Sequence, residues 1–296
     1  MAAEVLTLLR DARHVLDGTL GGGGHSQALL EHGADVTALD RDPQAIAAAR
    51  ERLRDFERAG RFHPVPGNFA AIDDLDALAG VRFDGILLDL GLSSHQIDDM
   101  TRGFTFREGA ALDMRMGPDA VMTGAELLNT AGEHELTRVF REYGDEPRAA
   151  RLVREVVRRR ANRPFASSDD LVAAIRGALG ARTGPSDFAR LFQAVRIEVN
   201  GELAALEGAL PALRDRLVPG GVLAVISYHS GEDRIVKHAF REWSADCICP
   251  PRQPICTCRG HALGETLTRR PIDATAAERE RNARARSARL RAWRAS

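Results

Sequence analysis

A glycine-rich segment is the part of this 296-residue sequence that is best suited to binding a reactive small molecule. It reads Asp17-Gly-Thr-Leu-Gly-Gly-Gly-Gly-His25, and Asp40 ends the apolar stretch that follows. Such a turn lets the backbone approach a ligand closely, and the N–H groups of a following helix suit a carboxylate or a phosphate. An acid at the position of Asp40 can accept hydrogen bonds from both hydroxyls of a ribose. The pattern therefore predicts a site for a cofactor that contains adenosine.

Two cofactor classes compete for such a site, and the glycine spacing favours one of them. The dinucleotide fingerprint Gly-x-Gly-x-x-Gly is not supplied by Gly18 and Gly21–Gly24 in any register. This disfavours a nicotinamide-dependent oxidoreductase. S-adenosylmethionine fits better, because its amino acid end carries an ammonium group that Asp17 can face as well as a carboxylate. A tight bend without a ligand is the structural alternative, and four consecutive glycines beside an acid argue against it.

The elements around this segment alternate between strands and helices. Helices are predicted over 26–32 and over 43–58, the second with Asp42 as its N-cap and Pro43 in its first turn. Alternating strands and helices predict crossover units and a parallel sheet that is covered on both faces. The predicted strands are 14–17, 35–40, 62–65, 83–90 and 221–228.

A helical insertion separates the fourth predicted strand from the fifth. It has no strand-like run, and helices are predicted to begin near Thr123, Asp145 and Ser167. We therefore divide the chain into a first core part (1–118), an inserted helical domain (119–194) and a second core part (195–296). The second part is expected to open with one long helix over 193–217 and to end in a solvated arginine-rich tail over 276–296.

The charge of the chain gives no overall attraction to nucleic acid, because the formal net charge is -1. Contacts with RNA must then come from local clusters of arginine. The helices of the insertion carry such an arginine cluster, which could pair with RNA phosphates. The alternative is that these arginines form a solvated face whose charge is balanced by glutamates. Neither a leader peptide nor a membrane-spanning run is recognisable, so a cytoplasmic protein is expected. The arginines are Arg138, Arg141, Arg148, Arg151, Arg154, Arg158, Arg159 and Arg160.

Seven segments, in order along nearly the whole chain, resemble the ribosomal RNA small subunit methyltransferase H family. The resemblance is carried by segments 17–26, 39–44, 89–96, 102–107, 112–116, 194–201 and 227–234. It implies an α/β fold, a class I (Rossmann-like) methyltransferase core dependent on S-adenosylmethionine, with a helical insertion. It also implies N4 methylation of the P-site cytidine in the decoding region of 16S rRNA, within the small ribosomal subunit. The residues that the resemblance assigns to the cofactor are Gly23, Gly24, His25, Asp40, Phe69, Asp89 and Gln96.

The catalytic residues are predicted from the chemistry of the target. A cytosine amine is a poor nucleophile because its lone pair is delocalised into the ring, so a group that accepts its protons is needed. Other amino-methyltransferases place Pro-Pro after the acid of the fourth strand, whereas Asp89 is followed by Leu-Gly-Leu. We therefore expect the acceptor elsewhere, first at Asp113 and next at Ser227 or His229. A salt bridge between Asp113 and Arg115 is the structural alternative, and a non-catalytic RNA-binding assembly factor is the alternative function.

All four cysteines lie in one short segment, as Cys247-Ile-Cys249 and Cys256-Thr-Cys258. Clustered cysteines in an intracellular protein favour a metal or plain thiols over disulfides. Four thiolates can bind zinc, but the usual zinc knuckle has two residues between its cysteines. The sequence leaves the metal question open, with reduced thiols as the default expectation.

Overall fold

The computed structural model describes residues 1–250, 253 and 255–296, which form two compact units. The sheet unit consists of residues 1–91 and 203–296, and the helical unit consists of residues 92–202. The helical unit begins earlier and ends later than the range 119–194 expected from the helix pattern. The reason is packing, because Leu112 and Met114 from the preceding loop and Val199 from the last helix belong to its apolar core.

The sheet unit contains a mixed sheet with strand order β3-β2-β1-β4-β5-β8-β6, and β7 pairs with β8. Strands β1 to β5 are parallel to one another, as predicted, whereas β8 is antiparallel to β5, β6 and β7. Strand β5 begins at Leu217 and not at Gly221, so Pro219 lies within it, where the pairing with β4 shifts register. The strands are β1 (His14–Asp17), β2 (Asp35–Asp40), β3 (Phe62–Pro66), β4 (Phe83–Asp89), β5 (Leu217–Ser227), β6 (Gly264–Thr266), β7 (Ile272–Asp273) and β8 (Arg289–Ala295).

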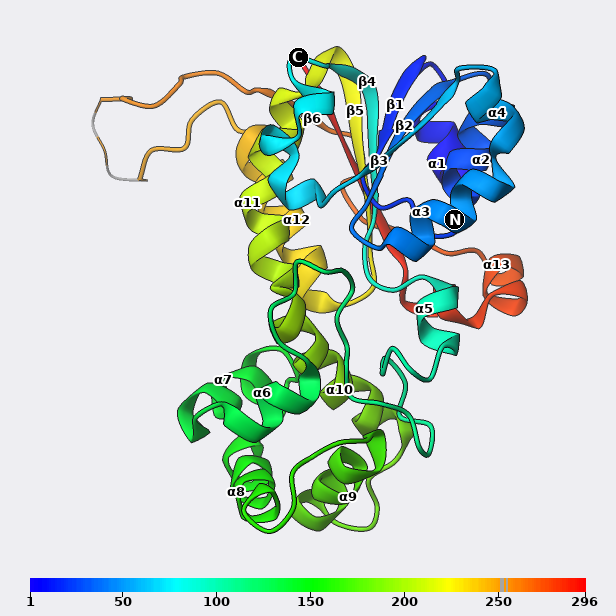
Figure 1. The fold of residues 1–296 in the computed structure, drawn as a ribbon. Coiled ribbons are helices and arrows are strands. Elements are labelled where there is room, and N and C mark those ends of the chain that lie inside the picture. Colours follow the sequence, from blue (N-terminus) through cyan, green and yellow to red (C-terminus); the bar gives the residue numbers. More distant parts are fainter. Residues whose placement is uncertain (251–252, 254) are drawn as a thin grey trace. The chain divides into compact units, whose positions relative to one another are not determined.

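Helices cover both faces of this sheet, with α2 and α3 on one side and α11 and α12 on the other (Figure 1). Neighbouring residues of a strand point to opposite faces, so Leu87 packs toward the first group and Leu88 toward the second. The helix predicted over 43–58 is two helices, which are divided at Leu53. The helices are α1 (Ala2–Leu8), α2 (Gly24–Glu31), α3 (Pro43–Arg52), α4 (Arg54–Arg58), α11 (Glu202–Asp215), α12 (Ser230–Trp243) and α13 (Ala276–Arg281).

The prediction of a solvated arginine-rich tail is wrong. Residues 276–281 form α13, and β8 lies in the interior of the sheet between β5 and β6. Four apolar residues lie among the three arginines of β8, and Trp293 is fully buried. The one arginine buried in this strand, Arg291, donates two hydrogen bonds to Asp233 of α12 at 2.7 and 3.1 Å. Burying an arginine without a partner would cost free energy, and Asp233 offsets that cost although it lies far from Arg291 in the sequence.

The helical unit has its own apolar core, formed largely by α7, α8, α9 and α10. The helices predicted to begin near Thr123 and Ser167 are present, and each begins with a capping box. The single helix predicted over 193–217 is interrupted at Gly201, whose φ of +60° is the left-handed conformation typical of a helix end. Within the described ranges, none of the helices is long and apolar enough to cross a membrane. The helices are α5 (Ser94–Asp98), α6 (Gly124–Thr130), α7 (Glu133–Glu142), α8 (Ala149–Arg160), α9 (Ser168–Leu179) and α10 (Pro185–Asn200).

Candidate functional site

The glycine-rich segment lies at the carboxyl ends of β1 and β4, where the strand order reverses. The chain proceeds from β1 outward to β2 and β3, then returns to β4 on the other side of β1. Parallel sheets bind ligands at such a switch point, because the loops from the two halves diverge there and leave a crevice. The amide of Gly18 donates to the Leu87 carbonyl of β4 at 2.8 Å, which fixes the start of the segment to both strands.

The glycines of the segment have two different physical roles. Gly23 has φ of +73° and caps α2, a conformation that favours glycine. A Cβ atom at Gly24 would meet nothing within 4 Å, so the backbone at the first residue of α2 faces open space. A Cβ atom at Gly18 would instead lie 2.5 Å from the Leu88 Cδ2. The helix start can therefore accommodate the carboxylate of an amino acid, whereas a side chain at Gly18 would require Leu88 to shift.

Asp40 ties the glycine segment to the start of α3. Its Oδ2 accepts the Gly21 amide at 2.7 Å, and its Oδ1 accepts the Asp42 amide at 2.8 Å. Burial raises the pKa of Asp40, although these two amide hydrogen bonds oppose the rise. Each carboxylate oxygen has a second lone pair. Asp40 can thus hold the loop and still accept hydrogen bonds from two ribose hydroxyls.

Asp17 supports the segment from within. Its Oδ2 accepts the Ser26 hydroxyl at 2.6 Å, its Oδ1 accepts the Thr19 amide at 3.2 Å, and the residue is only 1% exposed. Burial raises the pKa of the Asp17 carboxyl. The predicted contact between Asp17 and an ammonium group is therefore not one that this conformation offers.

Asp89 is the centre of a polar group at the end of β4. Its Oδ1 accepts the Tyr228 hydroxyl at 2.9 Å, and its Oδ2 lies 3.5 Å from the His25 Nε2. The Asp89 amide donates to the Thr19 hydroxyl at 2.6 Å. Burial raises the pKa of Asp89, and the nearby His25 opposes the rise. Asp89 thus joins the ends of β1 and β5 to β4, through its amide and its carboxylate respectively.

Tyr228 and Thr19 are members of this group that the sequence did not indicate as site residues. The available signal for Tyr228 was its place between Ser227 and His229 at the end of β5. The buried Nδ1 of His25 has no hydrogen-bond partner among the described residues. Because His25 is in the first turn of α2, that atom is available to a polar group of a ligand bound there.

The other predicted residues of the sheet unit have packing or capping contacts. The Phe69 Cβ would lie 3.5 Å from a Cβ atom at Gly18, which places Phe69 beside the glycine segment. The Ser227 hydroxyl donates to the Arg289 carbonyl of β8 at 3.3 Å. His229 is the N-cap of α12, and its Nε2 lies 3.1 Å from the Glu232 Oε1.

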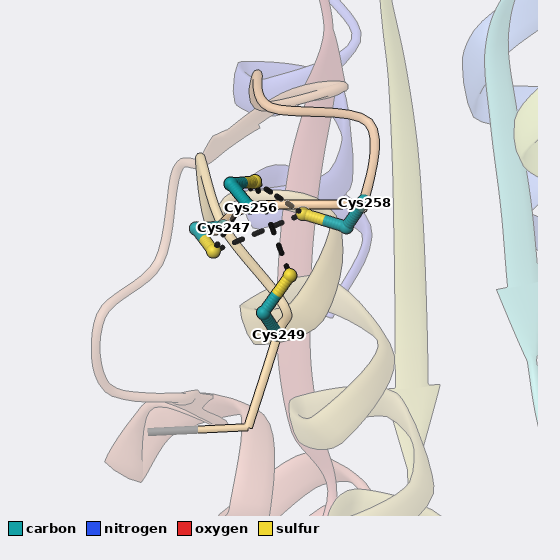
Figure 2. Close-up of side chains that lie close together, drawn as sticks. All are labelled: Cys247, Cys249, Cys256 and Cys258. Carbon is teal, nitrogen blue, oxygen red and sulfur yellow. Dashed lines mark hydrogen bonds between the residues drawn. The ribbon is translucent and has the colours of Figure 1, made fainter. Parts of the chain in front are cut away.

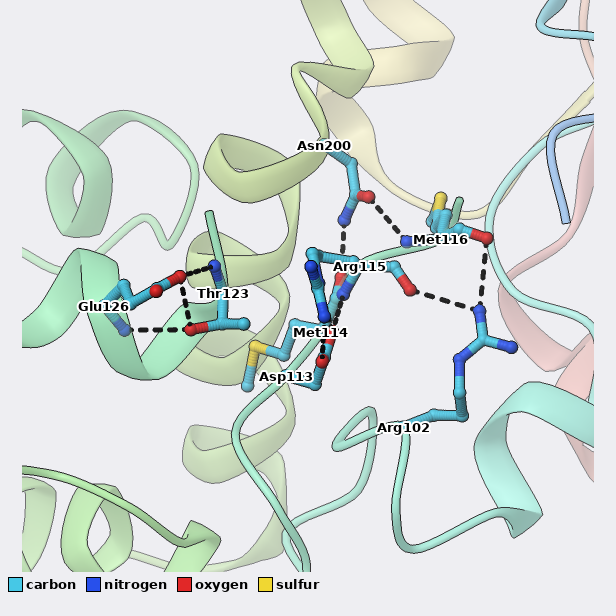
Figure 3. A network of polar contacts seen from close by, with 8 residues as sticks. All are labelled: Arg102, Asp113, Met114, Arg115, Met116, Thr123, Glu126 and Asn200. Atoms are coloured by element: carbon cyan, nitrogen blue, oxygen red, sulfur yellow. Dashed lines mark hydrogen bonds and ion pairs between the residues drawn. The ribbon is translucent and has the colours of Figure 1, made fainter. Parts of the chain in front are cut away.

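Asp113 and Gln96 belong to the helical unit. The Gln96 Oε1 accepts the Ser93 amide at 3.0 Å. The guanidinium of Arg115 donates to both oxygens of Asp113 at 2.9 and 2.8 Å and holds the pKa of Asp113 below its usual range. The salt bridge considered as the alternative for Asp113 is therefore present (Figure 3).

Figure 3 also shows how the segment after Asp113 is held. The Asn200 side chain donates to the Met114 carbonyl at 2.7 Å and accepts the Met116 amide at 2.8 Å. The Arg102 guanidinium donates to the Met116 carbonyl at 3.1 Å. Met114 has φ of +62°, which is unusual for a residue with a side chain. Three of the segments used for the family resemblance thus meet here and fix the backbone beside Asp113.

Most of the arginines proposed as an RNA-binding face have partners inside the helical unit. Arg138 pairs with Glu198 at 2.6 Å, and Arg158 and Arg159 both pair with Glu155. Arg148 and Arg160 are also engaged, through a glutamate and main-chain carbonyls respectively. The exposed members for which the described part of the chain shows no partner are Arg141, Arg151 and Arg154.

Comparison with known proteins identifies relatives that match the chain over nearly its whole length. Ribosomal RNA small subunit methyltransferase H of Gemmatimonas aurantiaca is 64% identical over all of this chain and 94% of its own length. The protein of the same name from Heliobacterium mobile is 48% identical over 93% of this chain and 90% of its own length. The one from Myxococcus xanthus is 44% identical over 97% and 93%. A model of the MraW methylase family matches residues 1–296, and the chain belongs to that family.

Proposed function

We propose that this protein transfers a methyl group from S-adenosylmethionine to the N4 amine of the P-site cytidine in 16S rRNA. Membership of the MraW methylase family makes the chain a methyltransferase that depends on S-adenosylmethionine. The names of relatives that match nearly its whole length support an rRNA substrate. We propose in addition that the target is one cytidine of the small ribosomal subunit and that the protein acts in the cytoplasm.

The observation that carries the cofactor site is the arrangement of Asp40 and α2 around the glycine segment. Asp40 is fixed by two amides, the start of α2 is open at Gly24, and the buried Nδ1 of His25 lacks a partner among the described residues. We assign the ribose to Asp40 and the amino acid end to Gly23, Gly24 and His25. Phe69, Asp89 and Gln96 complete the proposed cofactor set.

The reaction requires one proton to leave the amine as the new bond forms. When bound, S-adenosylmethionine supplies an electrophilic methyl group, and the carbon–sulfur bond breaks as the nitrogen–carbon bond forms. Asp113 remains our first candidate for the proton acceptor, with Ser227 and His229 next. Alignment of the amine with the methyl group contributes most of the acceleration, on the order of several powers of ten.

The test is methyl transfer to small ribosomal subunits that lack the modification. With labelled S-adenosylmethionine and the purified full chain, we expect label in a cytidine that mass spectrometry identifies as N4-methylated, at a single position. Label in another nucleoside would disprove the target assignment. Absence of label with normal cofactor binding would support a non-catalytic assembly factor instead.

Substitution of Asp113 by asparagine separates chemistry from cofactor binding. If Asp113 accepts the amine proton, we expect turnover to fall by about a hundredfold or more while cofactor affinity changes by less than about threefold. Calorimetry and single-turnover kinetics measure the two quantities. Because Arg115 lowers the pKa of Asp113, loss of rate through protonation of Asp113 should occur at lower pH than for an ordinary aspartate.

Arg115→Ala is the matched control for this variant, because it removes the same salt bridge but keeps the acid. If Asp113 serves only to anchor Arg115, the two variants will be equally impaired. Turnover of Asp113→Asn within about twofold of the unmodified chain would exclude it as the acceptor.

A further inference from the structure

The four cysteines lie in an excursion of the sheet unit between α12 and β6. Figure 1 shows this excursion extending away from the sheet. In its described part, residues 244–250, 253 and 255–263, no residue is buried. The segment therefore lacks an apolar core of its own, and another interaction must hold it together.

The four sulfur atoms nevertheless gather at one point. They all lie within 4.8 Å of one another, and Figure 2 shows them turned toward a common centre. The Sγ of Cys256 is 3.8 Å from that of Cys247, 3.9 Å from that of Cys249 and 3.4 Å from that of Cys258. The Cys258 and Cys247 sulfurs are 3.8 Å apart.

These separations match a single tetrahedral ion. Zinc binds thiolates at about 2.3 Å, and the corners of a tetrahedron of that radius are about 3.8 Å apart. A disulfide needs about 2.05 Å between its sulfurs, and all four cysteines are free. We propose that Cys247, Cys249, Cys256 and Cys258 bind one zinc ion as four thiolate ligands.

Two backbone amides donate hydrogen bonds to cysteine sulfurs and so stabilise the thiolate form. The amide of Ile248, between the first two cysteines, donates to the Cys258 sulfur at 3.4 Å. The amide of Thr257, between the last two, donates to the Cys249 sulfur at 3.4 Å. Each Cys-x-Cys segment thus donates an N–H hydrogen bond to a sulfur of the other segment. Hydrogen bonds of this kind commonly orient the ligands of metal sites.

The short spacing argued against a zinc knuckle in the sequence, and the structure removes that objection. In a knuckle with two intervening residues, a turn of the backbone between the two cysteines brings both sulfurs to the metal. Here neither pair is helical. Side chains two residues apart in an extended chain point to the same side. Two such pairs facing each other present four sulfurs to one point.

Four protein ligands leave no open position, so the ion has a structural role. Zinc binding releases the thiol protons to solvent, and its free energy orders the excursion. Ile248 and Ile255 lie beside the cluster and are exposed to solvent, so zinc binding would fix the position of two exposed apolar side chains.

Metal content of the full chain tests the proposal. Purified under reducing conditions without chelator, the protein should contain one zinc ion per chain, as measured by inductively coupled plasma mass spectrometry. Cobalt that replaces the zinc should give the absorption of a tetrahedral tetrathiolate. The double variant Cys247→Ser, Cys249→Ser should lose more than nine-tenths of the metal, with circular dichroism and cofactor binding used to check that the sheet unit is folded.

Ile255→Ser is the matched control, since Ile255 lies in the same excursion, is 74% exposed and offers no ligand. It should keep one zinc per chain. The chain has no other cysteine, so a thiol reagent reports on this cluster alone. Four freely reacting thiols in the native protein, two disulfides by intact mass, or iron in place of zinc would each overturn the proposal.

Discussion

Substitution of Asp40 by alanine is expected to weaken the binding of S-adenosylmethionine at least tenfold. Asp40 is the acceptor that we assign to the ribose, and a hydrogen bond to a charged acceptor contributes about 1.5 to 3 kcal/mol. The variant also releases the Gly21 and Asp42 amides from their shared carboxylate. Calorimetry with the purified full chain measures the dissociation constant.

Asp35→Ala is the control for this variant, because Asp35 begins the same strand, is exposed and pairs with Arg61 at the surface. It should leave the affinity unchanged. Since burial raises the pKa of Asp40, cofactor affinity should also decline on acidification at a higher pH than an ordinary aspartate would dictate. Unchanged affinity in Asp40→Ala would remove Asp40 from the cofactor site.

Substitution of Asp233 by alanine is expected to destabilise the sheet unit by about 3 to 5 kcal/mol. The change leaves the Arg291 guanidinium, which is 8% exposed, without its closest charged partner. An unpaired buried charge costs more than the pair itself contributes. Denaturant unfolding followed by far-ultraviolet circular dichroism measures the loss.

Two further variants distinguish this mechanism from a general weakness of β8. Glu265→Ala, on β6, breaks the pair with Arg294 of β8, in which both side chains are exposed, and should cost less than about 1 kcal/mol. The double variant Asp233→Leu, Arg291→Met removes both charges and should recover most of the stability. A small effect of Asp233→Ala would mean that Arg291 reaches solvent or another carboxylate.

The first four strands and the main helix caps could be predicted because their signals are local. Strand β2 alternates between the two apolar faces of the sheet, and Thr123 and Ser167 cap helices through residues three positions away. The glycine segment and Asp40 could be found for the same reason, since each follows directly from the end of a strand. Local patterns failed where an element depends on a distant partner.

Strand β8 shows that dependence most clearly. Its arginines predict a solvated tail until Asp233, 58 positions earlier, is placed against Arg291. In the same way, the Tyr228 hydroxyl meets Asp89 across 139 positions of sequence, and no spacing rule relates the two. The contact between Asn200 and Met114 spans 86 positions.

The sequence by itself therefore determined the parallel sheet, the helical insertion, the nucleotide-type loop and the family, because these depend on periodicity, capping and contiguous motifs. Only the tertiary structure decided which charges are paired, which carboxylate joins His25 to Tyr228, and that four cysteine sulfurs share one point. Those properties arise from the distance between side chains in space. That distance is set by the packing of the whole sheet unit, or of the helical unit, and not by separation along the chain.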